Sequence, residues 1–451
     1  MTDLLRVARS RPDSDSGQPF RIPESRYHTQ NTDSVLCRPV CRKTPGHVAS
    51  PVRFISHALR KTGSAARILG ITAALMAMIT PPVTHASTDR VQQASGISTK
   101  ASKALMLDIT RAGPALLAAG DRGYILRSID QGMSWQQIAT PVSTALTDLW
   151  FVDEQHGWAT GHGGVVLHTS DGGSSWKLQL DGHQINHMTL RFYEQEKQSL
   201  ENSLDQLDDI AREDAELVLE ELEFKLEDAQ VATEEGAGKP LLSVWFKDRN
   251  QGWVVGAYGM IFHTTDGGQS WQPAMSRVPN PDGFHFNSIG QLSGDTLFMA
   301  GEAGTLYRSD NAGADWLRLD SPYEGSFFGF QWLAQHNAVI AYGLRGNAFI
   351  SYDQGDSWHA LDVPGKESVM NAIATADQLI LLGGSGSVWQ ADLKQSNHQT
   401  KPELQRIRLP RSLPISSGLK VSDNLLALTG LGGIRLINWP VDQTARQHQK
   451  Q

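Results

Sequence analysis

A repeated unit occupies most of this 451-residue chain and constrains its fold more than any other feature of the sequence. The two clearest copies are residues 150–176, WFVDEQHGWATGHGGVVLHTSDGGSSW, and residues 245–271, WFKDRNQGWVVGAYGMIFHTTDGGQSW. The second half of the unit recurs five more times, so that the seven copies have their first glycines at residues 120, 161, 256, 301, 343, 383 and 430. The copies are 40 to 47 residues apart except for one interval of 95, which therefore contains an insertion.

Each full copy contains four short apolar runs separated by turn residues. A period of this length with four runs per copy is typical of a β-propeller, in which every copy forms one four-stranded blade. A single blade cannot bury both of its faces, so we expect the copies to close into a ring and stack sheet on sheet. The sequence therefore predicts an all-β fold, a seven-bladed β-propeller over residues 87–451. The seventh copy lacks an outer strand, which we expect residues 91–95 to supply.

The turn between the third and fourth strands carries the motif S-x-D-x-G-x-x-W, known as the Asp-box or BNR motif. The aspartate can accept backbone hydrogen bonds across the turn, the glycine permits a positive φ, and the tryptophan covers apolar surface between blades. Because one motif recurs around the ring, we interpret it as a fold element and not as a set of metal ligands or catalytic acids. The residues predicted for this structural role are Asp130, Asp171, Asp266, Asp310, Asp353, Trp135, Trp176, Trp271, Trp316 and Trp358.

The insertion, residues 183–238, joins blade 2 to blade 3. In an antiparallel meander, links between blades share one face with the turns between second and third strands, here the G-x-x-G turns, whereas the Asp-boxes lie on the opposite face. Residues 189–230 contain no glycine or proline and have apolar residues at helical spacing, which predicts an amphipathic helix or a helical hairpin bending near residues 208–214. Residues 191–235 hold 16 acidic and 4 basic side chains. The insertion is therefore either a solvated helical face or an arm that contacts a partner.

The first 67 residues form a basic leader with 12 Arg or Lys and 5 Asp or Glu, and they lack hydrophobic periodicity. We expect this leader to be disordered, and an early assignment of the start codon would account for it. An apolar stretch and a small-residue site at residues 68–86 are typical of a secretory signal peptide and too short to span a membrane. Both cysteines, Cys37 and Cys41, lie in the leader, so we expect an exported chain without disulfides. The net charge of −8 argues against nucleic-acid binding.

The repeats G-x-x-G-x-[IL]-x-x-[ST]-x-D-x-G-x-[ST]-W resemble those of the photosystem II stability/assembly factor family. The resemblance implies a seven-bladed propeller that acts as an assembly chaperone, with arginines of one face contacting the partner. The equivalents here are Arg122 and Arg345 in G-x-x-G turns and Arg127 and Arg308 on third strands. Tyr258 replaces an arginine in a matching turn. This difference and the acidic insertion favour a bacterial branch of the family.

The sequence favours a non-enzymatic scaffold or assembly factor in the periplasm, or in the thylakoid lumen of a photosynthetic source, because no nucleophile–base arrangement and no cofactor or metal motif is evident. The expected partner is an envelope or membrane protein complex. The predicted partner-binding residues are Arg122, Arg127, Tyr258, Glu302, Arg308 and Arg345. The alternative is a sialidase-like Asp-box glycoside hydrolase, which needs two carboxylates flanking a sugar, with Glu302 and Glu324 as candidates.

Overall fold

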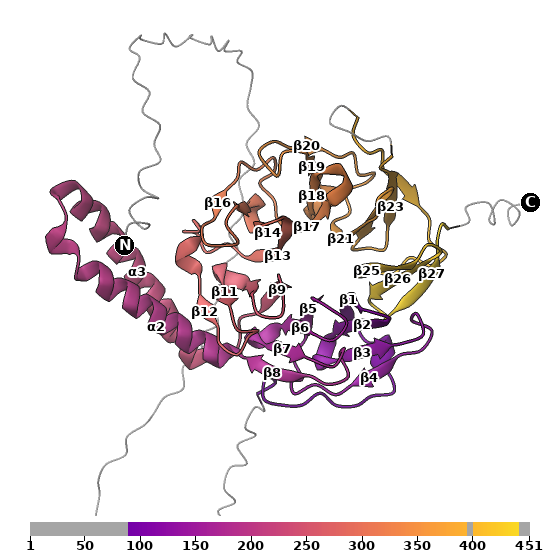
Figure 1. Ribbon diagram of the computed structural model, residues 1–451, viewed down its shortest axis with the longest axis horizontal. Helices are drawn as coiled ribbons and strands as arrows, with labels where there is room; N and C mark the ends of the chain where they lie inside the picture. The colour runs from indigo at the N-terminus through magenta and orange to yellow at the C-terminus, as the bar shows by residue number, and fades with distance from the viewer. Residues whose placement is uncertain (1–88, 395–399, 442–451) are drawn as a thin grey trace, which may run out of the picture. The chain divides into compact units, whose positions relative to one another are not determined.

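The computed structural model describes residues 89–394 and 400–441 (Figure 1). Its strands form seven antiparallel sheets that succeed one another around a ring. Six sheets have four strands and the seventh has three, so the predicted seven-bladed propeller is confirmed. The predicted leader and signal peptide lie outside the described residues.

The strands follow the order of the chain, four to a blade. Blades 1 and 2 contain β1 (Met106–Ala112), β2 (Ala115–Gly120), β3 (Ile125–Ser128), β4 (Gln136–Ile138), β5 (Leu146–Phe151), β6 (Gly157–Gly161), β7 (Val166–Thr169) and β8 (Lys177–Leu180). Blades 3 and 4 contain β9 (Leu241–Phe246), β10 (Gly252–Gly256), β11 (Ile261–Thr264), β12 (Gln272–Pro273), β13 (Phe286–Ser293), β14 (Thr296–Gly301), β15 (Leu306–Ser309) and β16 (Leu317–Arg318).

Blades 5 to 7 continue this order. They contain β17 (Phe327–Leu333), β18 (Ala338–Gly343), β19 (Ala348–Ser351), β20 (His359–Ala360), β21 (Val369–Ala374), β22 (Gln378–Gly383), β23 (Val388–Asp392), β24 (Gln405–Ile407), β25 (Ile415–Ser422), β26 (Leu425–Gly430) and β27 (Arg435–Asn438). The first strand of every blade contacts the first strands of both neighbouring blades, which places these strands innermost in the ring.

The hydrophobic cores lie between blades, because each sheet packs its apolar side chains against the next sheet. Leu117 and Ile125 of blade 1, for example, share a core with Leu149 and Leu167 of blade 2. Trp158 of β6 stacks on Phe246 of β9 with ring centroids 3.5 Å apart. Each blade is therefore stabilised mainly by its two neighbours.

The prediction that residues 91–95 complete blade 7 is wrong. Val91 is buried in the core between blades 1 and 2, and the Ser95 amide donates to the Thr140 carbonyl beyond β4. Within the described residues blade 7 has three strands, and the ring closes through contacts between β1 and blade 7. Arg111 of β1 donates to the Val421 carbonyl at 2.7 Å. An apolar core shared by the two blades completes the seam.

The Asp-box turns are held by a repeated set of hydrogen bonds. In the first of them, the Ser134 amide donates to Asp130 Oδ1 at 2.9 Å and the Ser134 hydroxyl donates to Oδ2 at 2.5 Å. The same two bonds recur at the other turns of this kind, where the acceptors are Asp171, Asp266 and Asp353. Each carboxylate is thus occupied by its own turn.

The assignment of Asp310 to this role is wrong, because Asn311 occupies the position two residues after Ser309. Asn311 Oδ1 accepts from the Asp315 amide at 2.9 Å and from the Ser309 hydroxyl. Asp310 points away from the turn and pairs with Arg308 at 3.2 Å. The run Ser309-Asp310-Asn311 offers two similar side chains one residue apart, and the spacing to Gly313 decides between them.

Replacing Asn311 by alanine should therefore lower the free energy of unfolding by about 1–2 kcal/mol, because a capping acceptor is lost from the turn. Asp310→Ala removes only an exposed ion pair and should change it by about 0–1 kcal/mol. Urea denaturation of the two variants measures the difference. Equal losses in both would contradict the assignment.

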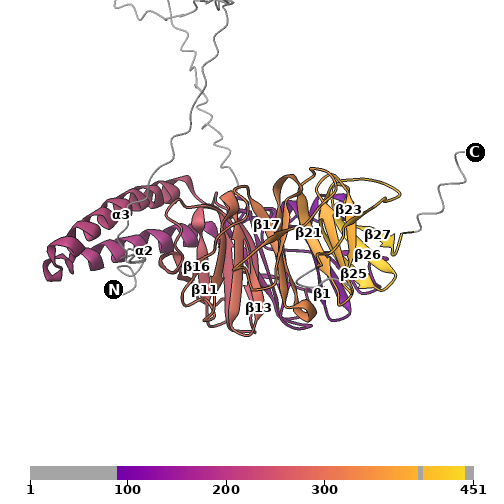
Figure 2. The ribbon, with the colours of Figure 1, turned by 90° about the horizontal axis from the view of Figure 1, so that it is seen from above.

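The insertion is a helical hairpin, so the single-helix alternative is wrong. It consists of α2 (Gly182–Glu201), the short 3₁₀ turn η4 (Leu204–Gln206) and α3 (Asp209–Glu235), and Figure 2 shows the two helices side by side. The bend comes slightly earlier than predicted because Asp208 is the N-cap of α3 and accepts from the Ala211 amide at 2.9 Å. Gly236, with φ of 87°, ends α3.

Candidate partner-binding face

The G-x-x-G turns and the links between blades lie together on one face of the ring, called the turn face below. In blades 1 to 6 the amide of the second turn residue donates to a carbonyl of the link before the blade, as in His162 to the Ala145 carbonyl at 2.8 Å and Leu344 to the Ser326 carbonyl at 3.0 Å. The third residue has a positive φ in blades 1 to 5. Three of these tips carry large exposed side chains, those of Arg122, Tyr258 and Arg345.

The base of the hairpin lies at the turn face beside the turn of blade 2, η3 (His162–Gly164), and its two helices extend outward from the edge of the ring (Figures 1 and 2). A Cβ on Gly164 would come within 2.8 Å of the Gly182 Cα atom, which shows how closely the start of α2 packs on this turn. Ile185 of α2 is buried in the core between blades 2 and 3. The first turns of α2 therefore anchor the hairpin to the propeller.

The structure brings two of the predicted residues together through a third that the sequence analysis missed. His285 Nδ1 lies 2.8 Å from Glu302 Oε2, and the His285 ring lies 4.9 Å from the Tyr258 ring, centroid to centroid. Lys239 Nζ lies 5.3 Å from the centre of the same tyrosine ring. These four side chains form a polar row across the turn face of blades 3 and 4. Lys239 and His285 both lie in links, which the repeat motif does not mark.

Arg127 and Arg308 do not join this face. Arg127 Nε donates to the Gly172 carbonyl at 2.8 Å, and Arg308 Nη1 lies 2.7 Å from Asp356 Oδ1 and donates to the Gln354 carbonyl. The acceptors belong to the Asp-box turns of the next blades. These two arginines therefore connect neighbouring blades on the Asp-box side and lie apart from Arg122 and Arg345.

Two further arginines of the turn face were missed because the seventh copy has lost the residues that mark its register. Arg435 begins β27, and its Nη2 donates to the Leu413 carbonyl at 3.3 Å. Its Nε and Nη1 are buried without a hydrogen-bond partner among the described residues. Burial, together with the nearby charge of Arg411, lowers the pKa of Arg435. Arg411 itself is exposed in the link before blade 7.

Basic side chains thus follow the turn face from blade 5 through blade 7 to blade 1, and this set is called the basic arc. It consists of Arg345, Lys366, Arg411, Arg435, Lys103 and Arg122. Arg122 is paired with Asp121 at 3.4 Å but remains 72 % exposed. The acidic hairpin leaves the same face at blades 2 and 3. The turn face and the hairpin that extends from its edge therefore present opposite charges in separate regions, a pattern that suits oriented docking of a partner.

Asp108 of β1 and Asp148 of β5 form a pair of carboxyl groups on the innermost strands. Asp108 accepts from the Ser417 hydroxyl at 2.7 Å and from the Leu149 amide at 3.0 Å. Asp148 Oδ2 accepts from the Ser243 hydroxyl and from the amide of the following residue, Val244, at 2.8 and 2.9 Å.

Burial and the charge of Asp108 raise the pKa of Asp148 to about 7. The carboxyl oxygens of both residues bind the adjacent blades, so we interpret the pair as connections between strands and not as a catalytic dyad.

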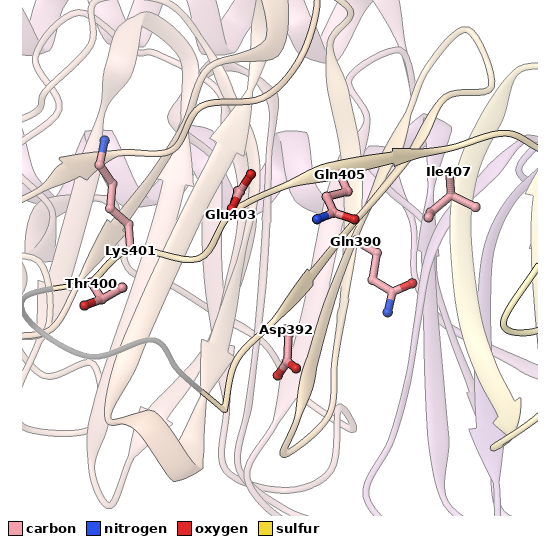
Figure 3. Close-up of a pocket in the computed structure, with 7 residues that line it drawn as sticks. All are labelled: Gln390, Asp392, Thr400, Lys401, Glu403, Gln405 and Ile407. Carbon is pink, nitrogen blue, oxygen red and sulfur yellow. The ribbon is translucent and has the colours of Figure 1, made fainter.

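A polar hollow of about 360 Å³ lies at the outer edge of blade 6 (Figure 3). It is lined by Gln390, Asp392, Thr400, Lys401, Glu403, Gln405 and Ile407. The hollow is open, its charges are mixed, and it adjoins residues outside the described ranges, so it does not define the site. Within residues 89–394 and 400–441, no cluster of three or more His, Cys, Asp or Glu side chains is arranged to hold a metal ion. No helix in that part of the chain is long and apolar enough to cross a membrane.

The repeated blades, their Asp-box turns and the charged turn face define a seven-bladed propeller of the BNR class. The family model described as photosynthesis system II assembly factor YCF48 matches residues 127–200 and 223–389, more than half of the chain. The chain therefore belongs to this family.

Curated relatives match over shorter segments. The photosystem II assembly lipoprotein Ycf48 of Synechococcus sp. strain CC9902 is 32 % identical over 121 residues, which cover 26 % of this chain and 36 % of that protein. The chloroplastic photosystem II stability/assembly factor HCF136 of Cyanidioschyzon merolae is 38 % identical over 76 residues, 16 % of each protein. The chain thus matches about a third or less of the length of these relatives.

Solved structures of this family share the fold. A structure described as YCF48 bound to D1 peptide has a TM-score of 0.50 at 14 % identity and covers 77 % of this chain and 96 % of its own. YCF48 from Cyanidioschyzon merolae has a TM-score of 0.50 at 13 % identity, covering 76 % and 97 %. At this identity the likeness establishes the fold.

Proposed function

We propose that this protein is an exported, non-enzymatic assembly factor that binds a segment of a membrane protein complex on its turn face. The observation that carries the proposal is the basic arc on that face together with the acidic hairpin, whose base lies at the same face. A partner segment with charges of both signs would be held in one orientation by such a surface. Membership in the assembly factor family supports the role, and the neighbour described as bound to a D1 peptide supports peptide binding by this fold.

Export is part of the proposal and rests on two observations. The apolar stretch at residues 68–86 follows basic residues and ends in a small-residue site, as a signal peptide does. The Synechococcus relative is described as a lipoprotein, which is a class of exported protein. The exported protein would then lie in the periplasm, or in the thylakoid lumen of a photosynthetic source.

Deletion of residues 189–230 should leave a folded propeller that no longer captures its partner. The deletion keeps Ile185 in its core and joins α2 to α3 near Asn186 and Ala232, which are already hydrogen-bonded at 2.6 Å. The tagged full-length protein and the deletion variant are cross-linked in the envelope fraction, and co-purified membrane proteins are quantified by mass spectrometry. We expect at least a tenfold loss of the partner with the deletion.

Arg345→Glu combined with Arg411→Glu tests the basic arc in the same assay and should cause a similar loss. Arg318→Glu, an exposed arginine on the outer strand β16, is the matched control and should capture as the wild type does. Thermal unfolding verifies that every variant is folded. An unchanged set of captured proteins with both the deletion and the double variant would refute the proposed function.

A further inference from the structure

A row of exposed apolar side chains runs along α3. The residues occur at every seventh position, and they are Ile210, Leu217, Phe224 and Val231, which are 77 %, 63 %, 63 % and 46 % exposed. Residues seven apart lie on the same side of a helix, two turns from one another. At 1.5 Å per residue the row is about 30 Å long. It is called the outer row below.

The outer row is not the surface that holds the hairpin together. The buried residues of α3 are Ala215, Leu222, Ala229 and Ala232, which pack on the side of α2. Asn186 of α2 fixes the two helices at the base by donating to the Ala232 and Gly236 carbonyls. The helix therefore has a second apolar face that nothing in the described chain covers.

Acidic residues flank the outer row along its whole length. Helical spacing places them on both sides, Glu213, Glu220, Glu227 and Glu234 on one and Asp214, Glu221, Asp228 and Glu235 on the other. Two lysines of the hairpin are paired: Lys197 lies 2.7 Å from Glu223, which is in neither set, and Lys225 lies 2.5 Å from Glu221 of the second set. Within the described residues, no ion pair reaches the first of these two sets of acidic residues.

The apolar and acidic side chains of the outer row and its flanks indicate which kind of partner can bind there. Large apolar side chains at seven-residue spacing suit another helix, which can pack its own apolar face along the row. The flanking carboxylates repel both a second copy of the same row and an anionic membrane, and they attract Lys and Arg. Charge complementarity therefore points to a basic helix.

We propose that the outer row of α3 docks a basic amphipathic helix of the partner protein, with Lys or Arg on both sides of its apolar face. The proposal deepens the proposed function, because it names the kind of partner segment that the hairpin accepts. Its test uses a defined peptide, so a negative result here leaves the capture experiment on the basic arc unaffected.

The probe is a fluorescent 21-residue helical peptide with leucines at heptad a and d positions and lysines at e and g. Binding to the full-length protein is measured by fluorescence anisotropy at low and high salt. We expect saturable binding that weakens as salt rises, since the attraction between charges is screened. Leu217→Ser combined with Phe224→Ser should weaken it at least tenfold, and Glu220→Gln with Glu227→Gln should weaken it and flatten the salt dependence.

The matched control is Ile129→Ser with Met133→Ser, which removes apolar side chains 72 % and 78 % exposed in the first Asp-box turn and should leave binding unchanged. Equal melting temperatures show that the substitutions act on the surface alone. The proposal is overturned if the wild type does not bind the peptide, if the Leu217/Phe224 variant binds equally well, or if a peptide with glutamate in place of lysine binds as tightly. Sedimentation that shows self-association abolished by the Leu217/Phe224 variant would make a second copy the occupant and also overturn it.

Discussion

Replacing Trp158 by alanine is expected to lower the free energy of unfolding by about 3–5 kcal/mol, the usual cost of truncating a buried tryptophan. The side chain is fully buried on β6, lies nearly parallel to Phe246 at an interplanar angle of 6°, and its indole Nε1 donates to the Gly267 carbonyl at 3.4 Å. Both partners belong to blade 3. The substitution therefore leaves a cavity at the packing surface between two blades.

The expected loss should be cooperative, because a blade contacts mainly its two neighbours and a weakened contact affects the closure of the whole ring. Urea denaturation followed by tryptophan fluorescence and by far-ultraviolet circular dichroism measures it. Met133→Ala, at a side chain 78 % exposed, is the control and should change stability by about 0.5 kcal/mol or less. A loss below about 1 kcal/mol for Trp158→Ala would contradict the role of this contact.

The second large effect is a dependence of stability on pH that Asp148→Asn should strongly reduce. The pKa of Asp148 is raised from 3.8 to about 7 in the folded protein, first by burial and then by the charge of Asp108. The folded state thus holds this proton more tightly than the unfolded state does. The contribution of this proton to the free energy of unfolding is fully present below about pH 4 and is lost as the pH rises through about 7.

Asparagine suits the position because its carbonyl can accept from Ser243 and Val244 as the carboxyl does, and its amide can donate toward Asp108. Chemical denaturation at pH 4.5, 6 and 7.5 should show the wild type losing on the order of 2 kcal/mol across this range and the variant losing much less. Asp320→Asn, an exposed carboxyl group, should behave as the wild type. A wild type whose stability rises over this range would disprove the assignment.

The repeat was sufficient to predict the number of blades, their strand order and the two faces, because each turn is specified by glycines and polar side chains at fixed positions. The repeat motif led to wrong or missing assignments where two similar residues could occupy one position of the motif, or where a copy has diverged. Asp310 and Asn311 are adjacent candidates for one position, and Arg435 lies in a copy without an Asp-box. For the first pair the spacing to Gly313 determines the register, whereas the eroded motif around Arg435 leaves the register open.

Contacts between blades could not be predicted for a different reason. Asp108 and Asp148 occupy equivalent positions in consecutive copies, yet their role depends on neighbours in other blades, such as Ser417, 309 residues away in the chain. His285 and Glu302 meet only because a link and a turn share one face. The outer row of α3 was likewise hidden, because the helical pattern does not show which of two apolar faces packs on α2.

At the seam between blade 7 and blade 1, the last blade of the chain packs against the first. Among the described residues no strand is shared across that seam, since β1 opens its own sheet and β25 to β27 form theirs without residues 91–95. A blade and a copy of the repeat therefore have the same limits. Duplication or loss of one copy in a gene adds or removes a complete structural unit, and a circularly permuted chain opened at any link retains every sheet intact. Such a ring can change its number of units in evolution without first having to rearrange its closure.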